Sequence, residues 1–231
     1  MFTDQEKTEL LQLKSKILQH YNKKMNELKD TLLTSVFYEN CIITGGCISS
    51  LYFGEEVNDI DMYAKSPKQI KIIKDLITQI GEHIKEVKGY SLTDPSNKLI
   101  TNNAITLKND VQFITLGPAD ECRSKFDFIH CMPWFDIKTQ KLYISESQFT
   151  SIKTRTLYHN GHGEKLKEYR LQKYLGKGWK SSWELKQTTS NVLDTNTLMT
   201  LVTGSAGNGT VSLGLDPSAM TDSFLRMWDL K

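Results

Sequence analysis

The sequence has little of what membrane and secreted proteins carry. No apolar run approaches the roughly 20 residues that a membrane-spanning helix needs. The first residues, MFTDQEKTELLQL, are polar and contain no apolar signal core. The four cysteines, Cys41, Cys47, Cys122 and Cys131, lack the spacing of zinc ligands, and two of them lie inside apolar runs. We therefore expect a soluble cytoplasmic protein with reduced thiols.

The chain also lacks a strong excess of charge of either sign. It has 29 Lys and Arg residues against 27 Asp and Glu residues, a formal net charge of +2, which neither favours nor excludes a nucleic-acid partner. Its hydrophobic share of 39% is ordinary for a soluble globular protein, and 231 residues are enough to bury a core. Cations are nevertheless gathered between residues 151 and 180: Lys153, Arg155, Lys165, Lys167, Arg170, Lys173, Lys177 and Lys180.

Hydrophobic periodicity predicts alternating helices and strands along most of the chain. Helices are expected at residues 3–33, 46–53, 67–84 and 164–179. Strands are expected at residues 41–44, 58–64, 86–90, 104–107 and 111–116. Residues 128–135 fit either a strand or a helix, and residues 143–156 fit a short connection. This alternation indicates an α/β or α+β fold in which helices flank a mixed sheet.

We divide the chain into four parts on this pattern. An N-terminal helix occupies residues 1–35, a central α/β core residues 36–140, a basic helical extension residues 141–186 and a tail residues 187–231. The tail is rich in Ser, Thr, Gly and Asn, so we expect it to be flexible. Its terminal apolar segment, FLRMWDL, can dock on the protein itself or on a partner protein.

The most informative stretch is CIITGGCISSLYFGEEVNDIDMY, residues 41–63. Asp59 and Asp61 lie at alternate positions of a predicted strand, so their side chains project to the same face. Two neighbouring carboxylates repel each other, and Mg²⁺ or Mn²⁺ bound between them would relieve that repulsion. Gly45 and Gly46, followed by a helix, allow the backbone to approach a phosphate closely. Together these features are typical of phosphoryl or nucleotidyl transfer.

This stretch resembles the signature of the polymerase-beta-type nucleotidyltransferase superfamily. Within that superfamily it is similar to the head domain of bacterial-type CCA-adding enzymes and poly(A) polymerases. The residues that carry the resemblance are Gly45, Gly46, Ile48, Leu51-Tyr52-Phe53-Gly54 and Asp59-Ile60-Asp61-Met62. Looser likenesses follow in the expected order at residues 103–106, 111–113, 126–132 and 170–173. The sequence departs from the family at Ser49-Ser50, where the family has Arg-Asp.

The resemblance implies a role for each residue of the motif. Asp59 and Asp61 would hold two Mg²⁺ or Mn²⁺ ions. Gly45, Gly46 and Ser49 would bind the β- and γ-phosphates of a nucleoside triphosphate.

The later part of the chain would complete the site. Arg170 and Lys173 would steady the triphosphate or the base. Many superfamily members use a third carboxylate as general base on the acceptor hydroxyl. We favour Asp127 for a functional role over Asp110, because Asp110 lies in a turn with Asn109 that its side chain can cap.

The predicted reaction is transfer of a nucleoside monophosphate from an NTP to an acceptor hydroxyl, with release of pyrophosphate. An RNA 3′ end is the expected acceptor, because of the family resemblance and the basic segment 164–180. Two alternatives stay open. The chain could be a toxin-like nucleotidyltransferase that modifies protein or tRNA, or a non-catalytic structural or RNA-binding protein of the same fold.

Overall fold

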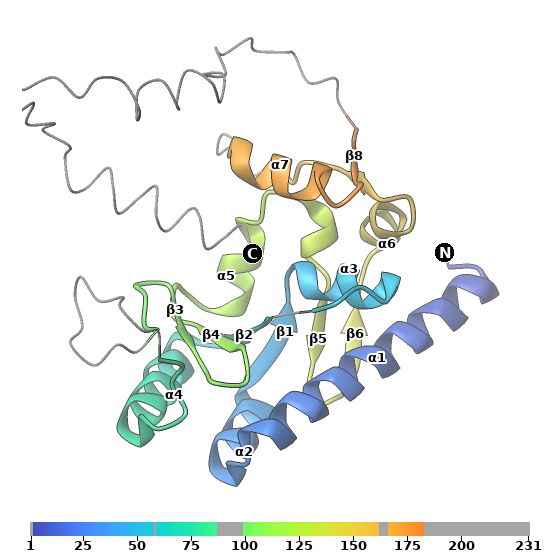
Figure 1. Cartoon of the computed structure of the whole chain (residues 1–231). Helices are drawn as coiled ribbons and strands as arrows, with labels where there is room; N and C mark the ends of the chain where they lie inside the picture. The colour runs from blue at the N-terminus through green and yellow to red at the C-terminus, as the bar shows by residue number, and fades with distance from the viewer. Residues whose placement is uncertain (1, 58, 87–98, 162–165, 183–231) are drawn as a thin grey trace, which may run out of the picture.

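The structure, a computed structural model, describes residues 2–57, 59–86, 99–161 and 166–182 and contains a six-stranded mixed sheet (Figure 1). Its strands are β1 Cys41–Thr44, β2 Ile60–Ala64, β3 Ala104–Thr106, β4 Val111–Ile114, β5 Trp134–Asp136 and β6 Lys141–Tyr143. They lie in the order β3-β4-β2-β1-β5-β6. β2 and β4 are parallel, and every other neighbouring pair is antiparallel. The mixed α/β class predicted from the sequence is confirmed.

Helices flank this sheet. They are α1 Asp4–Leu28, α2 Thr31–Asn40, α3 Gly46–Phe53, α4 Pro67–Ile80, α5 Ala119–Ser124, α6 Glu146–Lys153 and α7 Glu168–Leu175, with a short 3₁₀ turn, η1, at Ile129–Cys131. A separate parallel pair is formed by β7 Thr156–Leu157 and β8 Lys180–Ser181. Figure 1 shows α1 running across the sheet and α7 lying above α3. None of these helices combines the length and hydrophobicity that crossing a bilayer requires.

The elements around the glycine pair have the bounds that the sequence predicts. β1 occupies residues 41–44 and α3 residues 46–53, as expected. β2 begins at Ile60, slightly later than the predicted strand at 58–64. α3 ends at Gly54, whose left-handed conformation (φ 71°) stops the helix. Strand, turn and helix therefore follow one another as the motif requires.

The N-terminal helix predicted for residues 3–33 is two helices, so the prediction of one helix was wrong. Lys29 adopts a left-handed conformation (φ 56°, ψ 24°), which ends α1. The side chain of Asp30 then accepts a hydrogen bond from the Leu33 N–H (2.8 Å) and begins α2. The hydrophobic pattern continues through residues 29 and 30, but the left-handed Lys29 and the N-cap Asp30 divide it into two helices.

Helix α6 fills most of the stretch that we expected to be a connection, residues 143–156. Ser145 and Gln148 form a capping box at its start. The same Ser-x-x-Gln spacing is visible in the sequence and was the overlooked signal.

Other sequence predictions extend beyond the described part of the chain. α7 begins at Glu168 and ends at Leu175, so within the described residues the helix expected at 164–179 is shorter. The strand expected at 86–90 lies outside the described residues after its first position, and the tail at 187–231 lies wholly outside them.

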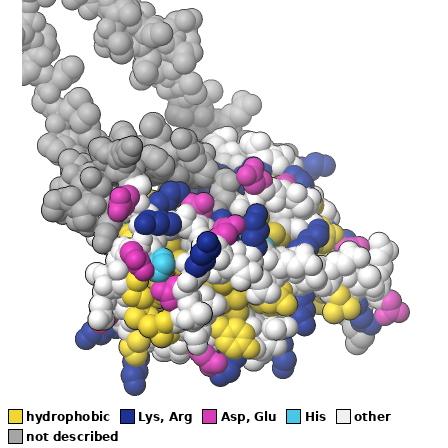
Figure 2. All heavy atoms as spheres, turned by 60° about the horizontal axis from the view of Figure 1, so that its bottom comes forward, with side chains coloured by type: hydrophobic (Ala, Val, Ile, Leu, Met, Phe, Trp, Pro, Cys, Tyr) yellow, Lys and Arg dark blue, Asp and Glu magenta, His cyan; other side chains and the backbone are white. Residues whose placement is uncertain are grey.

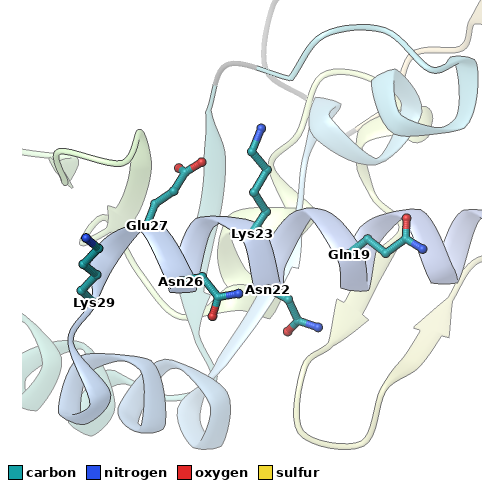
Figure 3. A pocket seen from close by; sticks show the side chains of 6 residues that line it. All are labelled: Gln19, Asn22, Lys23, Asn26, Glu27 and Lys29. Carbon is teal, nitrogen blue, oxygen red and sulfur yellow. The ribbon is translucent and has the colours of Figure 1, made fainter.

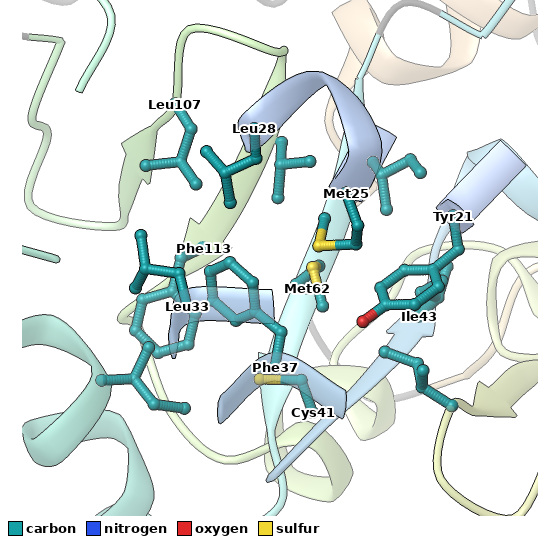
Figure 4. Close-up of a cluster of buried hydrophobic side chains, with 14 of the residues drawn as sticks. Tyr21, Met25, Leu28, Leu33, Phe37, Cys41, Ile43, Met62, Leu107 and Phe113 are labelled. Atoms are coloured by element: carbon teal, nitrogen blue, oxygen red, sulfur yellow. The ribbon is translucent and has the colours of Figure 1, made fainter. Parts of the chain in front are cut away.

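The core lies between the sheet and helices α1, α2 and α4. Side chains of the two N-terminal helices meet those of three adjacent strands, and all of them are buried: Tyr21, Met25, Leu28, Leu33, Phe37, Ile43, Met62 and Phe113 (Figure 4). Full burial of one such side chain contributes about 1.5–3 kcal/mol, so this face sets the register of the strands. Ile60 and Met62 of β2 face this core. The alternating residues Asp59, Asp61 and Tyr63 therefore face the other side of the sheet.

That second face of the sheet is covered in part by α5. Ala119 and Cys122 of this helix pack against Ile42 of β1 and Tyr63 of β2. The carboxylate pair lies on the same face and is half-buried.

Candidate functional site

The turn between β1 and α3 brings the backbone against the carboxylate pair. Gly45 has a φ of +96°, a conformation that side chains other than glycine rarely adopt. A Cβ at this position would lie 3.4 Å from Asp61 Oδ2. The Gly45 N–H donates to the Cys131 carbonyl oxygen (3.0 Å), which fixes the turn against η1. The turn therefore requires glycine for its conformation, and it brings the backbone close to Asp61.

Asp59 directly precedes β2 and Asp61 lies within it, and the surroundings of Asp59 disfavour its negative charge. Burial raises the pKa of Asp59, and the negative charge of Asp110 raises it further. Burial raises the pKa values of Tyr63 and Cys47, and the nearby charge of Asp61 raises both further. A divalent cation would stabilise such a cluster of like charges.

The donor set can supply part of a metal site. Within the described ranges, no three His, Cys, Asp or Glu side chains are arranged as a complete metal site. Asp59 and Asp61 supply two carboxylates, which suits Mg²⁺ or Mn²⁺ that takes its remaining ligands from substrate phosphates and water. The fit is therefore to a cation that binds together with its substrate.

Three lysines from separate parts of the chain oppose the negative charge. Lys24 belongs to α1, Lys85 follows α4 and Lys173 belongs to α7. Each of them lowers the pKa of Asp59, against the effects of burial and of Asp110. Lys173 was predicted from the sequence to bind substrate, whereas Lys24 and Lys85 were not predicted.

Helix α7 packs on the glycine turn. A Cβ at Gly46 would lie only 2.9 Å from Tyr174 Oη, so glycine leaves the space that α7 occupies. Tyr174 Oη also lies 3.0 Å from Cys131 Sγ. Burial raises the pKa of the Cys131 thiol to about 11, so this thiol is neutral at physiological pH. Tyr174 and Cys131 were not among the predicted site residues.

The predicted residues of α7 share one helical face with Tyr174. Arg170, Lys173 and Tyr174 are three and four positions apart. Tyr174 could have been found from that spacing, once Arg170 and Lys173 had been chosen. For Lys24 and Lys85 the sequence offers no comparable signal.

Asp127 and Arg170, both predicted site residues, bind each other. Arg170 Nη1 donates to Asp127 Oδ2 at 2.6 Å, and Asp127 is 7% exposed. The Arg170 Nε also donates to Tyr169 Oη (3.2 Å). The carboxylate of Asp127 is thus engaged by a cation, while the carboxylate whose charge acts on Asp59 is that of Asp110.

Ser49 lies one turn into α3 and is buried. Its hydroxyl donates to the Gly46 carbonyl oxygen at 2.8 Å. A hydrogen bond from Ser49 to a phosphate would require this hydroxyl to rotate away from Gly46. The phosphate-binding role of Ser49 stays a prediction.

The surface offers other features, which do not converge on a ligand. An open hollow of about 600 Å³ runs along α1 and is lined by Gln19, Asn22, Lys23, Asn26, Glu27 and Lys29. Figure 3 shows Lys23 and Glu27 pointing to one side of the helix and Asn22 and Asn26 to another. The face in Figure 2 carries interspersed cationic and anionic side chains with hydrophobic ones between them. The lining of the hollow does not include the carboxylate pair.

Solved structures that resemble the chain are tRNA-processing enzymes. A tRNA nucleotidyltransferase complexed with a primer tRNA and an incoming ATP analog has a TM-score of 0.43 and 14% identity, covering 62% of this chain and 43% of that chain. The Thermotoga maritima CCA-adding enzyme complexed with tRNA has a TM-score of 0.43 and 11% identity. The match covers 70% of this chain and 42% of that enzyme. The Bacillus stearothermophilus CCA-adding enzyme in complex with CTP has a TM-score of 0.40 and 12% identity. The match covers 62% of this chain and 36% of that enzyme.

Sequence comparison identifies the family. The chain is 26% identical over 162 residues to "Gabija anti-defense 2" of Bacillus phage SPbetaL7, an alignment that covers 68% of this chain and 38% of the length of that relative. The profile of the Gabija anti-defense 2 (Gad2) family matches residues 12–155, from within α1 to just beyond α6. The matched range includes Asp59, Asp61, Asp110 and Asp127, and it ends before α7. Because the profile covers more than half of the sequence, the chain belongs to the Gabija anti-defense 2 family.

Proposed function

We propose that this chain is a metal-dependent nucleotidyltransferase, which moves a nucleoside monophosphate from an NTP to an acceptor hydroxyl and releases pyrophosphate. The observation that carries the proposal is the contact between the glycine turn and the carboxylates. Asp61 Oδ2 lies 3.4 Å from the position of a Cβ at Gly45. A phosphate bound at the turn would therefore lie next to a cation bound by Asp59 and Asp61.

Asp59 and Asp61 would hold Mg²⁺ or Mn²⁺. When bound, the cations would lower the pKa of the attacking hydroxyl and neutralise charge on the leaving pyrophosphate. The raised pKa of Asp59 supports this assignment. Burial and a neighbouring carboxylate disfavour the ionised form of Asp59, and a bound cation would stabilise that form.

The triphosphate would lie between the glycine turn and α7. The backbone N–H groups at Gly46 and the following residues of α3 would donate to the β- and γ-phosphates, with Ser49 adding its hydroxyl after rotation. Lys173 acts on Asp59 and so is within electrostatic reach of a triphosphate that shares the cations. Arg170 would bind the triphosphate or the base.

The two remaining aspartates would have different roles. Asp127 would hold Arg170 in position for the nucleotide, since the two already form a 2.6 Å contact. Asp110, the cross-strand neighbour of Asp59, would be the third carboxylate beside the cations. Accordingly, Asp127→Asn should weaken NTP binding by releasing Arg170, whereas Asp110→Asn should lower turnover through the cation.

The acceptor would be an RNA 3′ end, supported by the resemblance of the motif and by the basic residues of α7. The family description further supports a reaction that counters the Gabija defence, with a component of that system as the partner. The chain spans 38% of the length of its curated relative, and the activity of the whole relative extends to this chain only as part of this proposal.

Incubation with α-labelled NTPs tests the proposal. The full chain would be mixed with each labelled NTP, Mg²⁺ or Mn²⁺, and either cellular RNA or a lysate freed of RNA. We expect label in the RNA, and a loss of at least about 100-fold for Asp59→Asn and Asp61→Asn. Asp75→Asn, exposed on α4, is the matched control and should keep full activity.

Other outcomes distinguish the alternatives. Label in protein rather than in RNA would show that the acceptor is a protein, while nucleotidyl transfer itself would still be supported. If the wild type and both site variants incorporate no label, and calorimetry detects no metal-dependent NTP binding, the chain is not a nucleotidyltransferase and a non-catalytic role gains support.

A further inference from the structure

The turn that carries Asp110 lies beside the carboxylate pair. Asp110 has a left-handed conformation (φ 61°), and its N–H donates to the Leu107 carbonyl oxygen (3.0 Å). Its own carbonyl oxygen accepts from the Ile60 N–H (3.2 Å). Because Ile60 pairs with Val111 in the parallel β2–β4 ladder, Asp110 is the cross-strand neighbour of Asp59. The hairpin thus adds a third carboxylate to the pair.

Two lysines from distant parts of the chain bind this third carboxylate. Lys85 Nζ lies 2.5 Å from Asp110 Oδ1, and Lys24 Nζ lies 3.9 Å from Asp110 Oδ2. Each carboxylate oxygen therefore faces one ammonium group. The Lys24 side chain is 11% exposed and that of Lys85 is 43% exposed, so only Lys85 has ready access to water.

The backbone holds both lysines at the hairpin. The Lys85 N–H donates to the Thr106 carbonyl oxygen (2.9 Å), on the strand that precedes the turn. On the other side, Asn109 Nδ2 donates to the Lys24 carbonyl oxygen (2.7 Å), which ties α1 to the turn itself. The two ion pairs are consequently a feature of the fold and not a chance meeting of flexible surface side chains.

We propose that Lys85 and Lys24 compete with the divalent cation for the carboxylate of Asp110 and so set the metal affinity of the site. This inference rests on the proposed function, because it requires a cation at Asp59 and Asp61. An oxygen that accepts from an ammonium group is a weaker metal ligand, and the ammonium charge repels the incoming cation. Asp59 and Asp61 would hold the cation, and the carboxylate of Asp110 would become available to it when Lys85 turns out to solvent.

Competition and a purely structural role of Lys85 predict opposite changes in metal affinity when Lys85 is removed. If Lys85 only stabilised the hairpin, its removal would loosen Asp110 and weaken metal binding. Competition instead predicts that removal of Lys85 tightens metal binding, because a repelling charge is lost and a ligand is freed. Lys85 is the better probe of the two lysines, since the nearly buried Lys24 contributes more to the packing of α1.

Mn²⁺ binding to the full chain, followed by the electron paramagnetic resonance signal of free Mn²⁺, tests the competition. Lys85→Met should bind Mn²⁺ about fivefold to tenfold more tightly than the wild type. Lys85→Arg keeps the charge and should bind as the wild type does. Lys74→Met, exposed on α4, removes the same charge elsewhere and should change the affinity less than about twofold.

A double mutant shows whether Lys85 acts through Asp110. In an Asp110→Asn background, Lys85→Met should change the Mn²⁺ affinity by less than about twofold. Unchanged or weaker Mn²⁺ binding by Lys85→Met, in protein that unfolds at the wild-type temperature, would overturn the competition. Equal Mn²⁺ binding by the wild type and Asp61→Asn would instead overturn the proposed metal site, and the inference with it.

Discussion

The two sides of strand β2 hold the carboxylate pair in different ways. On the β1 side, the glycine turn and α7 pack so closely that a Cβ at Gly46 would lie 2.9 Å from Tyr174 Oη. On the β4 side, Asp110 is held by ion pairs with Lys24 and Lys85. The contact between the glycine turn and Tyr174 depends on shape, whereas the β4 side depends on charge.

The difference indicates how each side responds to change. A close contact between uncharged groups is insensitive to salt, but a larger side chain at that contact destabilises the fold. Ion pairs that are partly exposed are weakened by salt and by the loss of either partner. Substitutions on the β1 side should therefore act through stability and geometry, and those on the β4 side through the electrostatics of cation binding.

The largest effect is expected on the β1 side, for Gly45→Val. The left-handed φ of +96° disfavours any side chain, and the Cγ atoms of valine would extend from a Cβ that already lies 3.4 Å from Asp61 Oδ2. We expect a loss of about 2–3 kcal/mol in the free energy of unfolding, measured in urea, together with loss of nucleotide transfer. Gly54→Val is the matched control, because Gly54 also has a positive φ (+71°) but a Cβ there meets no atom within 4 Å. Equal losses for the two variants would show that the contact with Asp61 is unimportant.

A smaller effect is expected for Gly46→Ala, and a second substitution should reduce it. The new Cβ would displace the Tyr174 hydroxyl and with it α7, at a cost of about 1–2 kcal/mol. Tyr174→Phe removes the oxygen that the Cβ meets, so Gly46→Ala should cost less in that background. A double-mutant cycle of urea unfolding measures the difference. Additive costs would argue against close packing between α7 and the turn.

Asp59→Asn should stabilise the metal-free fold at neutral pH. The folded-state pKa of Asp59 is raised by burial and by Asp110, so its ionised form destabilises the fold. That penalty is absent below the unfolded pKa of about 3.9 and appears as the pH rises through the folded pKa. Thermal unfolding in EDTA should therefore show a higher midpoint for Asp59→Asn than for the wild type at pH 7, and no difference near pH 3.5.

The contradicting result for Asp59 is a lower midpoint at pH 7. Asp75→Asn, at an exposed position of α4, controls for the loss of one negative charge and should leave the midpoint unchanged. Added Mn²⁺ should raise the midpoint of the wild type and not that of Asp59→Asn.

The smallest effect is expected for the ion pair between Asp127 and Arg170. The Arg170 side chain is 41% exposed, so solvent screens the pair and we expect a coupling of about 0.5–1 kcal/mol. A cycle of Asp127→Asn and Arg170→Met, measured by urea unfolding at low and high salt, gives the coupling. A coupling that does not fall with salt would show that the pair is held by packing and not by charge.

The β1 side could be predicted from the sequence because its determinants are local. Residues 41–64 contain the strand, the glycine turn, the helix and the carboxylates in one stretch, and alternation along β2 fixes which residues share a face. The resemblance to nucleotidyltransferases then singled out Arg170 and Lys173 of α7. Tyr174, which contacts the turn, follows from their spacing on the same helix.

The β4 side could not be predicted, because it depends on pairing between distant segments. The sequence placed Asp110 in a turn with Asn109, and the turn is present. Its position beside Asp59 follows from the parallel β2–β4 ladder, and its partners Lys24 and Lys85 come from α1 and from beyond α4. The break at Lys29 has a similar origin, since a left-handed lysine has no sequence signature.

The most direct test of the nucleotidyl-transfer proposal is a pair of reactions with the same NTP, labelled at the α-phosphate in one and at the γ-phosphate in the other. If the chain transfers nucleoside monophosphates, the α-label enters the acceptor and the γ-label is released as pyrophosphate. Both events require Mg²⁺ or Mn²⁺, and both are lost in Asp61→Asn. Transfer of the γ-label to the acceptor, or α-label incorporation by Asp61→Asn at the wild-type rate, would contradict it.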